Sequence, residues 1–170
     1  MSTESYRNKS AAQKKGETVQ LLTFKLDDQE YALNIANVVQ GVRMVALTHP
    51  PIAPDYMEGL FILRGKIIPV INVRARYGLP TKPHDLDTQL LIAKANGHTM
   101  AITVDAVSEV LTLPVDRIEP PEAIGPEMEY LSAVGKVGDR LILILDPNML
   151  MTNAAELTHA LASKQTEMAA

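Results

Sequence analysis

The residues that could carry out chemistry are few and scattered in this sequence. The chain has no cysteine and four histidines, which are His49, His84, His98 and His159. None of them has the spacing to another histidine or to an acidic residue that is typical of a metal site, and no phosphate-binding glycine loop is present. We therefore predict no catalytic residue, no metal site and no cofactor, and we expect that the protein is not an enzyme.

One pair of carboxylates could still act together. Asp105 and Glu109 are four residues apart, so on a helix they would share one face. Such a pair could serve as a general acid and base. The simpler interpretation, which we favour, is a solvated edge of the molecule.

A group of basic residues allows two interpretations. Arg74 and Arg76 are two residues apart, so on a predicted strand they would point to the same side, and with Arg64 and Lys66 they could form a basic patch. The patch could bind a partner, or its charges could protect an edge strand from unwanted pairing.

Composition limits the function classes further. The chain has 170 residues, a net charge of −4 and only 4% aromatic residues. Residues 1–17 carry four basic and two acidic residues, so the remainder has a charge of −6. An acidic body with few aromatic rings disfavours nucleic-acid binding. We predict a disordered tail over residues 1–17, no secretory signal and no membrane insertion, and the absence of cysteine suits a reducing compartment.

An internal repeat indicates the elements that position these residues. Residues 18–35 read as a hairpin, and a shift of 69 positions aligns residues 19–35 with residues 88–104 and places the turn Asp27-Asp28 on Asn96-Gly97. In the second half of each unit, "KIIPVIN" (66–72) matches "RLILILD" (140–146) at a shift of 74. The sequence therefore predicts a duplicated all-β unit.

The repeat also predicts the domain organisation. The two units cover about residues 18–78 and 88–147, with the Pro- and Gly-rich segment 78–87 between them. Units of this size bury little surface alone, so we expect two packed β-barrel subdomains with a binding groove between them. A helix is predicted over residues 148–166, because apolar residues recur there on one face, and we favour docking of that face on the protein's own barrels.

Several segments together resemble the bacterial chemotaxis coupling proteins, the CheW-like family. "YMEGLFILRGKIIPVINVRARYGLP" (56–80) is similar to the family signature of a glycine, an "NLRG" turn, an apolar strand with a proline, and an Asp-Leu-Arg segment. "DAVSEVLTLP" (105–114) and "EYLSAVGKVGDRLILILDPNMLM" (129–151) resemble later family segments. The resemblance covers about residues 18–151 and implies two intertwined SH3-like barrels with short helices.

The resemblance also implies a function. Proteins of this family are noncatalytic cytoplasmic adaptors in receptor arrays, where they join the cytoplasmic tip of a methyl-accepting chemoreceptor to the regulatory domain of a CheA-like histidine kinase. Carried over by position, the kinase contact comprises Gln40, Arg64 and Gly65. The receptor contact comprises Ile35, Val38, Val42, Val104 and Val107.

Three positions depart from the family pattern. The family usually has Glu at position 40, Asn at position 62 and Asp at position 72, whereas this chain has Gln40, Ile62 and Asn72. Ile62 could fill a core pocket, or it could extend an exposed apolar patch. Because an arginine binds a carboxylate more strongly than an amide, Gln40 would leave Arg64 freer to bind a partner's carboxylate. An alternative function is that of a diverged assembly protein with the same fold that acts outside flagellar chemotaxis.

Overall fold

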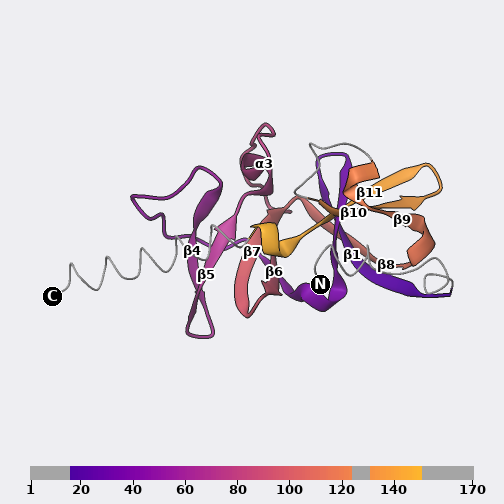
Figure 1. The fold of residues 1–170 in the computed structure, drawn as a ribbon. Coiled ribbons are helices and arrows are strands. Elements are labelled where there is room, and N and C mark those ends of the chain that lie inside the picture. The colour runs from indigo at the N-terminus through magenta and orange to yellow at the C-terminus, as the bar shows by residue number, and fades with distance from the viewer. Residues whose placement is uncertain (1–15, 124–130, 151–170) are drawn as a thin grey trace.

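The structure, a computed structural model, describes residues 16–123 and 131–150. Within these residues the chain forms eleven strands and a few short helices (Figure 1). The strands are β1 (Thr18–Leu26), β2 (Gln29–Asn34), β3 (Val38–Arg43), β4 (Met57–Leu63), β5 (Lys66–Ile71), β6 (Gln89–Ala95), β7 (His98–Val104), β8 (Ala106–Pro114), β9 (Ile118–Glu119), β10 (Leu131–Val137) and β11 (Arg140–Leu145). The helices are α3 (Val73–Arg76) and the 3-10 turns η1 (Ile35–Asn37), η2 (Val115–Arg117) and η3 (Pro121–Ala123).

The strands form two sheets that lie side by side (Figure 1). A six-stranded sheet, here called the terminal sheet, has the order β8-β1-β2-β11-β10-β9 and includes strands from both ends of the described chain. A five-stranded sheet, here called the central sheet, has the order β3-β6-β7-β5-β4. The predicted all-β class is therefore confirmed.

The pairing of the strands confirms the internal repeat. All six residue pairs of the β1–β2 hairpin recur in the β6–β7 hairpin at a shift of 69, so that Leu21–Asn34 corresponds to Leu90–Thr103. The β4–β5 and β10–β11 hairpins correspond at a shift of 74, and both contain the same irregularity in register near the start of the first strand. The two units are thus equivalent residue by residue, which allows each site in one sheet to be compared with its counterpart in the other.

Each unit is divided between the two sheets. The first unit gives β1 and β2 to the terminal sheet and β3, β4 and β5 to the central sheet, and the second gives β6 and β7 to the central sheet and β8, β9, β10 and β11 to the terminal sheet. β3, from the first unit, pairs with β6 of the second, and β8, from the second unit, pairs with β1 of the first. Each sheet therefore contains strands from both units. The ranges 18–78 and 88–147 describe the repeats in the sequence, and they do not correspond to the two sheets.

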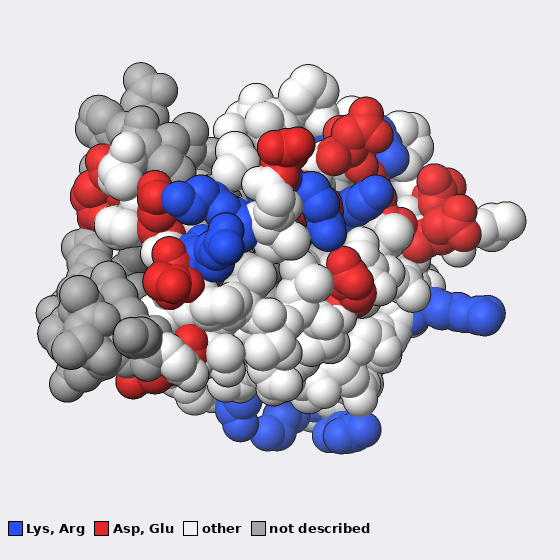
Figure 2. Space-filling model, turned by 90° about the vertical axis from the view of Figure 1, so that its right-hand side faces the viewer, with Lys and Arg blue, Asp and Glu red and all other residues white. Residues whose placement is uncertain are grey.

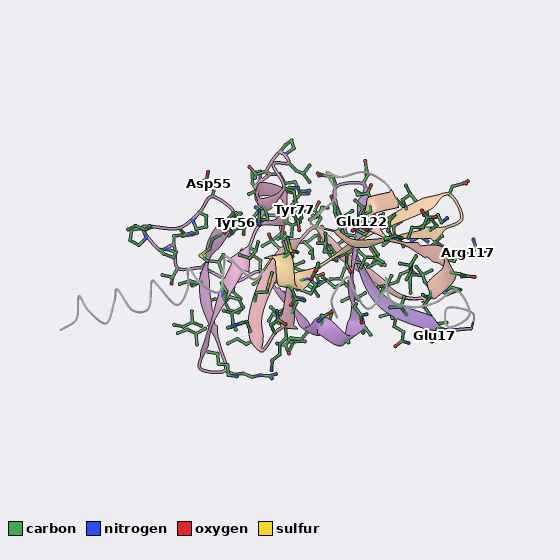
Figure 3. The ribbon with its side chains drawn as sticks, viewed as in Figure 1. Glu17, Asp55, Tyr56, Tyr77, Arg117 and Glu122 are labelled. Atoms are coloured by element: carbon green, nitrogen blue, oxygen red, sulfur yellow. The ribbon has the colours of Figure 1, made fainter. Side chains whose placement is uncertain are left out.

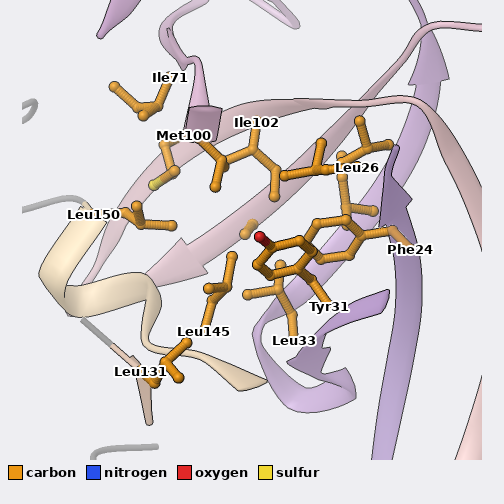
Figure 4. Packing of buried hydrophobic residues seen from close by; sticks show 14 of the residues in the cluster. Phe24, Leu26, Tyr31, Leu33, Ile71, Met100, Ile102, Leu131, Leu145 and Leu150 are labelled. Carbon is orange, nitrogen blue, oxygen red and sulfur yellow. The ribbon is translucent and has the colours of Figure 1, made fainter. Parts of the chain in front are cut away.

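One apolar core joins the two sheets. Its largest cluster combines Phe24 and Tyr31 of the terminal sheet with Met100 and Ile102 of the central sheet (Figure 4). The rings of Phe24 and Tyr31 are stacked, with centroids 5.9 Å apart. A cluster shared by both sheets means that neither sheet can bury its apolar face without the other.

The beginning of the predicted C-terminal helix belongs to this core. Residues 147–150 are helical, and Leu150 is only 1% exposed within the shared cluster. The start of the predicted apolar face therefore packs on the protein's own core. The remainder of the predicted helix to residue 166, and residues 1–15 of the predicted tail, lie outside the described residues.

A network of charges also connects the sheets. Arg74 is 7% exposed and donates two hydrogen bonds to the Asp105 carboxylate, at 3.0 and 2.6 Å. Asp27 in the β1–β2 turn and Lys82 in the segment between the units complete the network. Burial would raise the pKa of Asp105, but hydrogen bonds from the Arg74 side chain, the Asp27 backbone and the Lys82 side chain outweigh it and lower this pKa to about 2.

These contacts correct two sequence-based interpretations. Asp105 and Glu109 do not share a helix, because β8 begins at Ala106, and Asp105 is bound by Arg74 instead. Arg74 and Arg76 are not on a strand but in α3, near Tyr56 and Tyr77 (Figure 3). The Arg76 guanidinium lies over the Tyr56 ring at 5.0 Å. Both arginines are thus held by contacts within the protein and do not form a basic patch with Arg64.

Candidate protein-binding surface

The turn between β4 and β5 presents Arg64 in an uncommon backbone conformation. Leu63 pairs with Lys66, and the two residues between them, Arg64 and Gly65, have φ angles of 52° and 79°. Positive φ at both positions is the signature of a type I′ hairpin turn, which favours Asn-Gly. The β6–β7 turn, which also has positive φ at both positions, has that preferred sequence, Asn96-Gly97. An arginine in this position is strained, so the hairpin alone does not account for it.

An apolar groove lies beside this turn. It has a volume of about 590 Å³ and is lined by Val42, Val45, Ala46, Thr48, Leu60, Phe61, Ile62, Leu63 and Ile67. Ile62 is 72% exposed and Ile67 is 52% exposed. Ile62 therefore does not fill a core pocket; it belongs to an exposed apolar surface, which is the second of the two alternatives considered above.

The groove depends on a close approach between β4 and the segment before it. Thr48 and Leu60 exchange two backbone hydrogen bonds, each 2.8 Å long. A Cβ atom on the neighbouring Gly59 would lie 2.8 Å from the Leu47 Cβ and 2.8 Å from the Thr48 carbonyl oxygen. Only glycine fits at this position, and it allows residues 45–48 to form one wall of the groove.

Gln40 and Arg64 meet at the exposed end of this surface. The Arg64 Nη2 donates to the Gln40 Oε1 across 3.4 Å, which is long for a hydrogen bond. Gly65 completes the turn, and a Cβ atom added to it would contact nothing within 4 Å. The structure thus brings together all three residues that were assigned to the kinase contact.

The equivalent position in the terminal sheet is arranged differently. There Glu109 replaces Gln40, and Gly138 takes the place of Arg64. Arg140, the counterpart of Lys66, donates to Glu109 at 3.3 Å and to both oxygens of Glu30 at 2.8 and 2.6 Å. The hydrogen bonds from Arg140 lower the pKa of Glu30. The same bonds raise the pKa of Arg140, with the larger contribution from Glu30 and a smaller one from Glu109. Here the arginine is bound by two carboxylates of the protein itself.

The residues assigned to the receptor contact do not form one surface. Val38 and Val107 are partly buried and pack against the core cluster shared by the two sheets, as expected for repeat partners. Ile35 is partly exposed at the start of η1. Val104 is 0% exposed. Val42 lines the apolar groove beside Arg64 instead.

Sequence reasoning missed a largely buried carboxylate in β4, the strand that supplies part of the groove. Glu58 in β4 receives hydrogen bonds from the Asn72 side chain and from the Thr103 hydroxyl, and its Oε2 lies 2.8 Å from the His84 Nε2. Asn72 also accepts a hydrogen bond from the Ala75 backbone and so caps α3. Because an aspartate at position 72 would face the Glu58 carboxylate, the departure at this position has a local structural reason.

Glu58 and His84 also line a second cavity of about 310 Å³, together with His49. Among the residues that the structure describes, no group of three or more His, Cys, Asp or Glu side chains has the arrangement of a metal site. The same residues contain no helix that is long and apolar enough to span a membrane.

Comparison with known proteins identifies the family. The family model for the CheW-like domain matches residues 20–155. The chain belongs to the CheW-like family. The chemotaxis protein CheW of Helicobacter pylori is 32% identical over 130 residues, which cover 76% of this chain and 79% of that protein. CheW of Klebsiella aerogenes is also 32% identical, over 81% of this chain and 86% of its own length.

A solved structure supports the same conclusion. The crystal structure of the scaffolding protein TtCheW from Thermoanaerobacter tengcongensis is similar with a TM-score of 0.72 and 31% identity, over 76% of this chain and 90% of that one. The fold class expected from the sequence, two packed β-barrel subdomains, is thereby confirmed. Membership of this family makes the chain a chemotaxis adaptor, and the alternative of a diverged assembly protein outside chemotaxis is not favoured.

Proposed function

We propose that this protein is a noncatalytic adaptor that couples the cytoplasmic tip of a methyl-accepting chemoreceptor to the regulatory domain of a CheA-like histidine kinase, in the cytoplasm at receptor arrays. The observation that carries the proposal is the exposed apolar groove with Arg64 at its end, on a chain of the CheW-like family. An exposed groove next to a strained arginine is typical of a surface that another protein covers.

The kinase contact comprises Gln40, Arg64 and Gly65. These residues lie together at the end of the groove, and Val42 and Ile62 continue the same surface. We therefore add the groove to the kinase contact, and we move Val42 to it from the receptor contact.

The receptor contact comprises the remaining assigned residues at the junction of the two sheets. Ile35, Val38 and Val107 retain some exposure there and supply the apolar contact. Val104 supports them from the interior, because its side chain is fully buried. A contact at the junction would allow a bound receptor to act on both sheets.

Binding of two separate partners tests this function. The purified chain is titrated calorimetrically with the cytoplasmic fragment of a chemoreceptor and, separately, with the regulatory domain of the histidine kinase from the same organism. Arg64→Asn should weaken kinase binding at least about tenfold and leave receptor binding unchanged, because it removes a charged contact from one of the two surfaces only. Ile35→Glu should have the opposite selectivity.

Both variants need a check on folding. Arg64→Asn suits the turn and should not lower the melting temperature, so a loss of binding would reflect the lost contact. If the unmodified chain bound neither partner, the proposed function would be wrong. If Arg64→Asn weakened the binding of both partners equally, the division into two surfaces would be wrong.

A further inference from the structure

The central sheet differs from the rest of the molecule in its charge. Its five strands and two hairpin turns carry four basic residues, which are all exposed: Arg43, Arg64, Lys66 and Lys94. The single acidic residue in these segments is Glu58, whose side chain is 12% exposed and is bound by His84, Asn72 and Thr103. The accessible charges on this sheet are therefore positive, although the whole chain has a net charge of −4.

The terminal sheet shows the opposite balance. Its strands and hairpin turns carry three basic residues, Lys25, Lys136 and Arg140, against six acidic ones, Asp27, Asp28, Glu30, Glu109, Glu119 and Asp139. Figure 2 views this end of the molecule, and most of the basic side chains on it lie beside acidic ones. Along the lower margin of the same view, Lys and Arg side chains lie without acidic neighbours.

Arg64 is the basic residue best placed for a partner. A guanidinium offers several N–H donors, and the described residues provide Arg64 with one hydrogen bond, to a neutral amide across 3.4 Å. In the terminal sheet the counterpart of Gln40 is Glu109, which together with Glu30 binds Arg140, the counterpart of Lys66. Gln40 in place of a glutamate therefore leaves the positive charge beside the groove without compensation from a carboxylate.

Ile62 contributes to the apolar part of the surface. It projects at 72% exposure from the strand that leads into the turn, and Ile67 projects at 52% from the strand that follows. Both line the groove whose end carries Arg64. A partner that covers these side chains must bring aliphatic groups and must approach a cation at the same time.

From this arrangement we infer that Gln40 and Ile62 are specificity-determining residues. They select a kinase regulatory domain that presents aliphatic side chains to the groove, a carboxylate to Arg64 and no cation to Gln40. The inference rests on the proposed function and adds the chemistry of the partner's surface. Charge complementarity supports it, because Arg64 beside an apolar groove favours a carboxylate on the partner and disfavours a cation opposite Gln40.

The test measures the affinity of the kinase regulatory domain at low and at physiological salt. For the unmodified chain, binding should weaken as salt rises, because salt screens the charge pair. Gln40→Glu should weaken binding about tenfold and reduce this salt dependence, because the new carboxylate engages Arg64 within the protein. Ile62→Asn should weaken binding about tenfold with the salt dependence unchanged.

A matched control separates these effects from net charge. Arg117 is exposed in η2, at the opposite end of the molecule from the β4–β5 hairpin (Figure 3). Arg117→Gln lowers the net charge by one, as Gln40→Glu does, and should leave the affinity unchanged. In a second arm, Arg64→Glu should abolish binding, and changing one acidic residue of the kinase domain to lysine should restore it.

Each outcome has a defined meaning. If Gln40→Glu bound the kinase domain as tightly as the unmodified chain, or more tightly, the partner would carry a cation opposite position 40, and the inference would be wrong while the proposed function stood. The same conclusion would follow if Arg117→Gln weakened binding as much as Gln40→Glu. Absence of binding by the unmodified chain would overturn the proposed function and this inference together.

Discussion

The two hairpin tips at a shift of 74 have the same pairing and different chemistry. The β4–β5 tip reads Leu63-Arg64-Gly65-Lys66, and the β10–β11 tip reads Val137-Gly138-Asp139-Arg140. At the second tip Gly138 takes the positive φ angle of 60°, and the arginine is bound by two glutamates. At the first tip an arginine occupies the strained position, with only Gln40 as a described partner. Since the fold is satisfied by either sequence, the hairpin itself does not require an arginine at position 64.

The largest effect on stability is expected at the ion pair that connects the two sheets. Asp105→Asn leaves the nearly buried Arg74 with only the exposed Asp27 as a charged partner. We expect a loss of about 3 kcal/mol in the free energy of unfolding, because one partner of a largely buried ion pair is removed. Urea denaturation measures it, and Asp28→Asn in the neighbouring turn is the control, which should change stability by less than about 0.5 kcal/mol.

The stability that Asp105 contributes should also depend on pH. The pKa of Asp105 is about 2 in the folded protein, below the ordinary value of 3.8, so its ionised form stabilises the fold. This contribution, about 2 kcal/mol, is present above pH 4 and is lost as the pH falls from about 4 to 2. The stability difference between the unmodified chain and Asp105→Asn should therefore shrink over that range. A difference that stayed constant from about pH 6 to pH 2 would show that the Asp105 charge has no such role.

The second prediction concerns the wall of the groove. Gly59→Ala should lower stability by about 2 kcal/mol, because the added Cβ atom would press on Leu47 and on the Thr48 backbone. The equivalent residue in the terminal sheet is Ala133, which occupies the same place in the register. Ala133→Gly should cost about 1 kcal/mol, the usual effect of glycine in a strand. Equal losses at the two positions would contradict a special close approach at Gly59.

Sequence reasoning predicted the repeated hairpins because their turns and alternating strands are encoded locally. It also predicted that Val38 and Val107 occupy equivalent places, since the alignment of the repeats suffices for that. The repeat did not predict that each unit would be divided between the two sheets, because pairing between distant strands leaves no local pattern. Sequence reasoning placed Arg74 on a strand and left its partner unidentified, because the network with Asp105, Asp27 and Lys82 forms only when the two sheets meet.

The candidate surface, too, could be predicted from the sequence only in part. The positions of Gln40, Arg64 and Gly65 followed from the resemblance, but the groove did not, because it depends on residues 45–48 packing against β4. The exposure of Ile62 could not be decided from its type, since isoleucine is common both in cores and at interfaces. Glu58 gave no signal either, because its partners come from the residue before α3, from β7 and from the segment between the units.

The third prediction separates stability from function at the first tip. Arg64→Asn should raise the free energy of unfolding by about 1 kcal/mol, because asparagine accepts the positive φ angle of 52° more readily than arginine. Thermal and urea denaturation measure the gain. Lys66→Asn is the matched control, because it removes a neighbouring charge outside the positive-φ positions and should not stabilise the protein. A loss of stability in Arg64→Asn would show that the arginine supports the fold.

The smallest effect is expected at the second tip. Arg140→Gln removes the hydrogen bonds to Glu30 and Glu109 and leaves two carboxylates near each other. Because the network is at the surface, we expect a small decrease in melting temperature, which should diminish in high salt as the repulsion is screened. Arg64→Gln at the first tip should cause no such decrease, since Gln40 is neutral. If both variants lowered the melting temperature equally, the two tips would not differ in how far their arginines are engaged within the protein, and the argument that Arg64 is available to a partner would lose its basis.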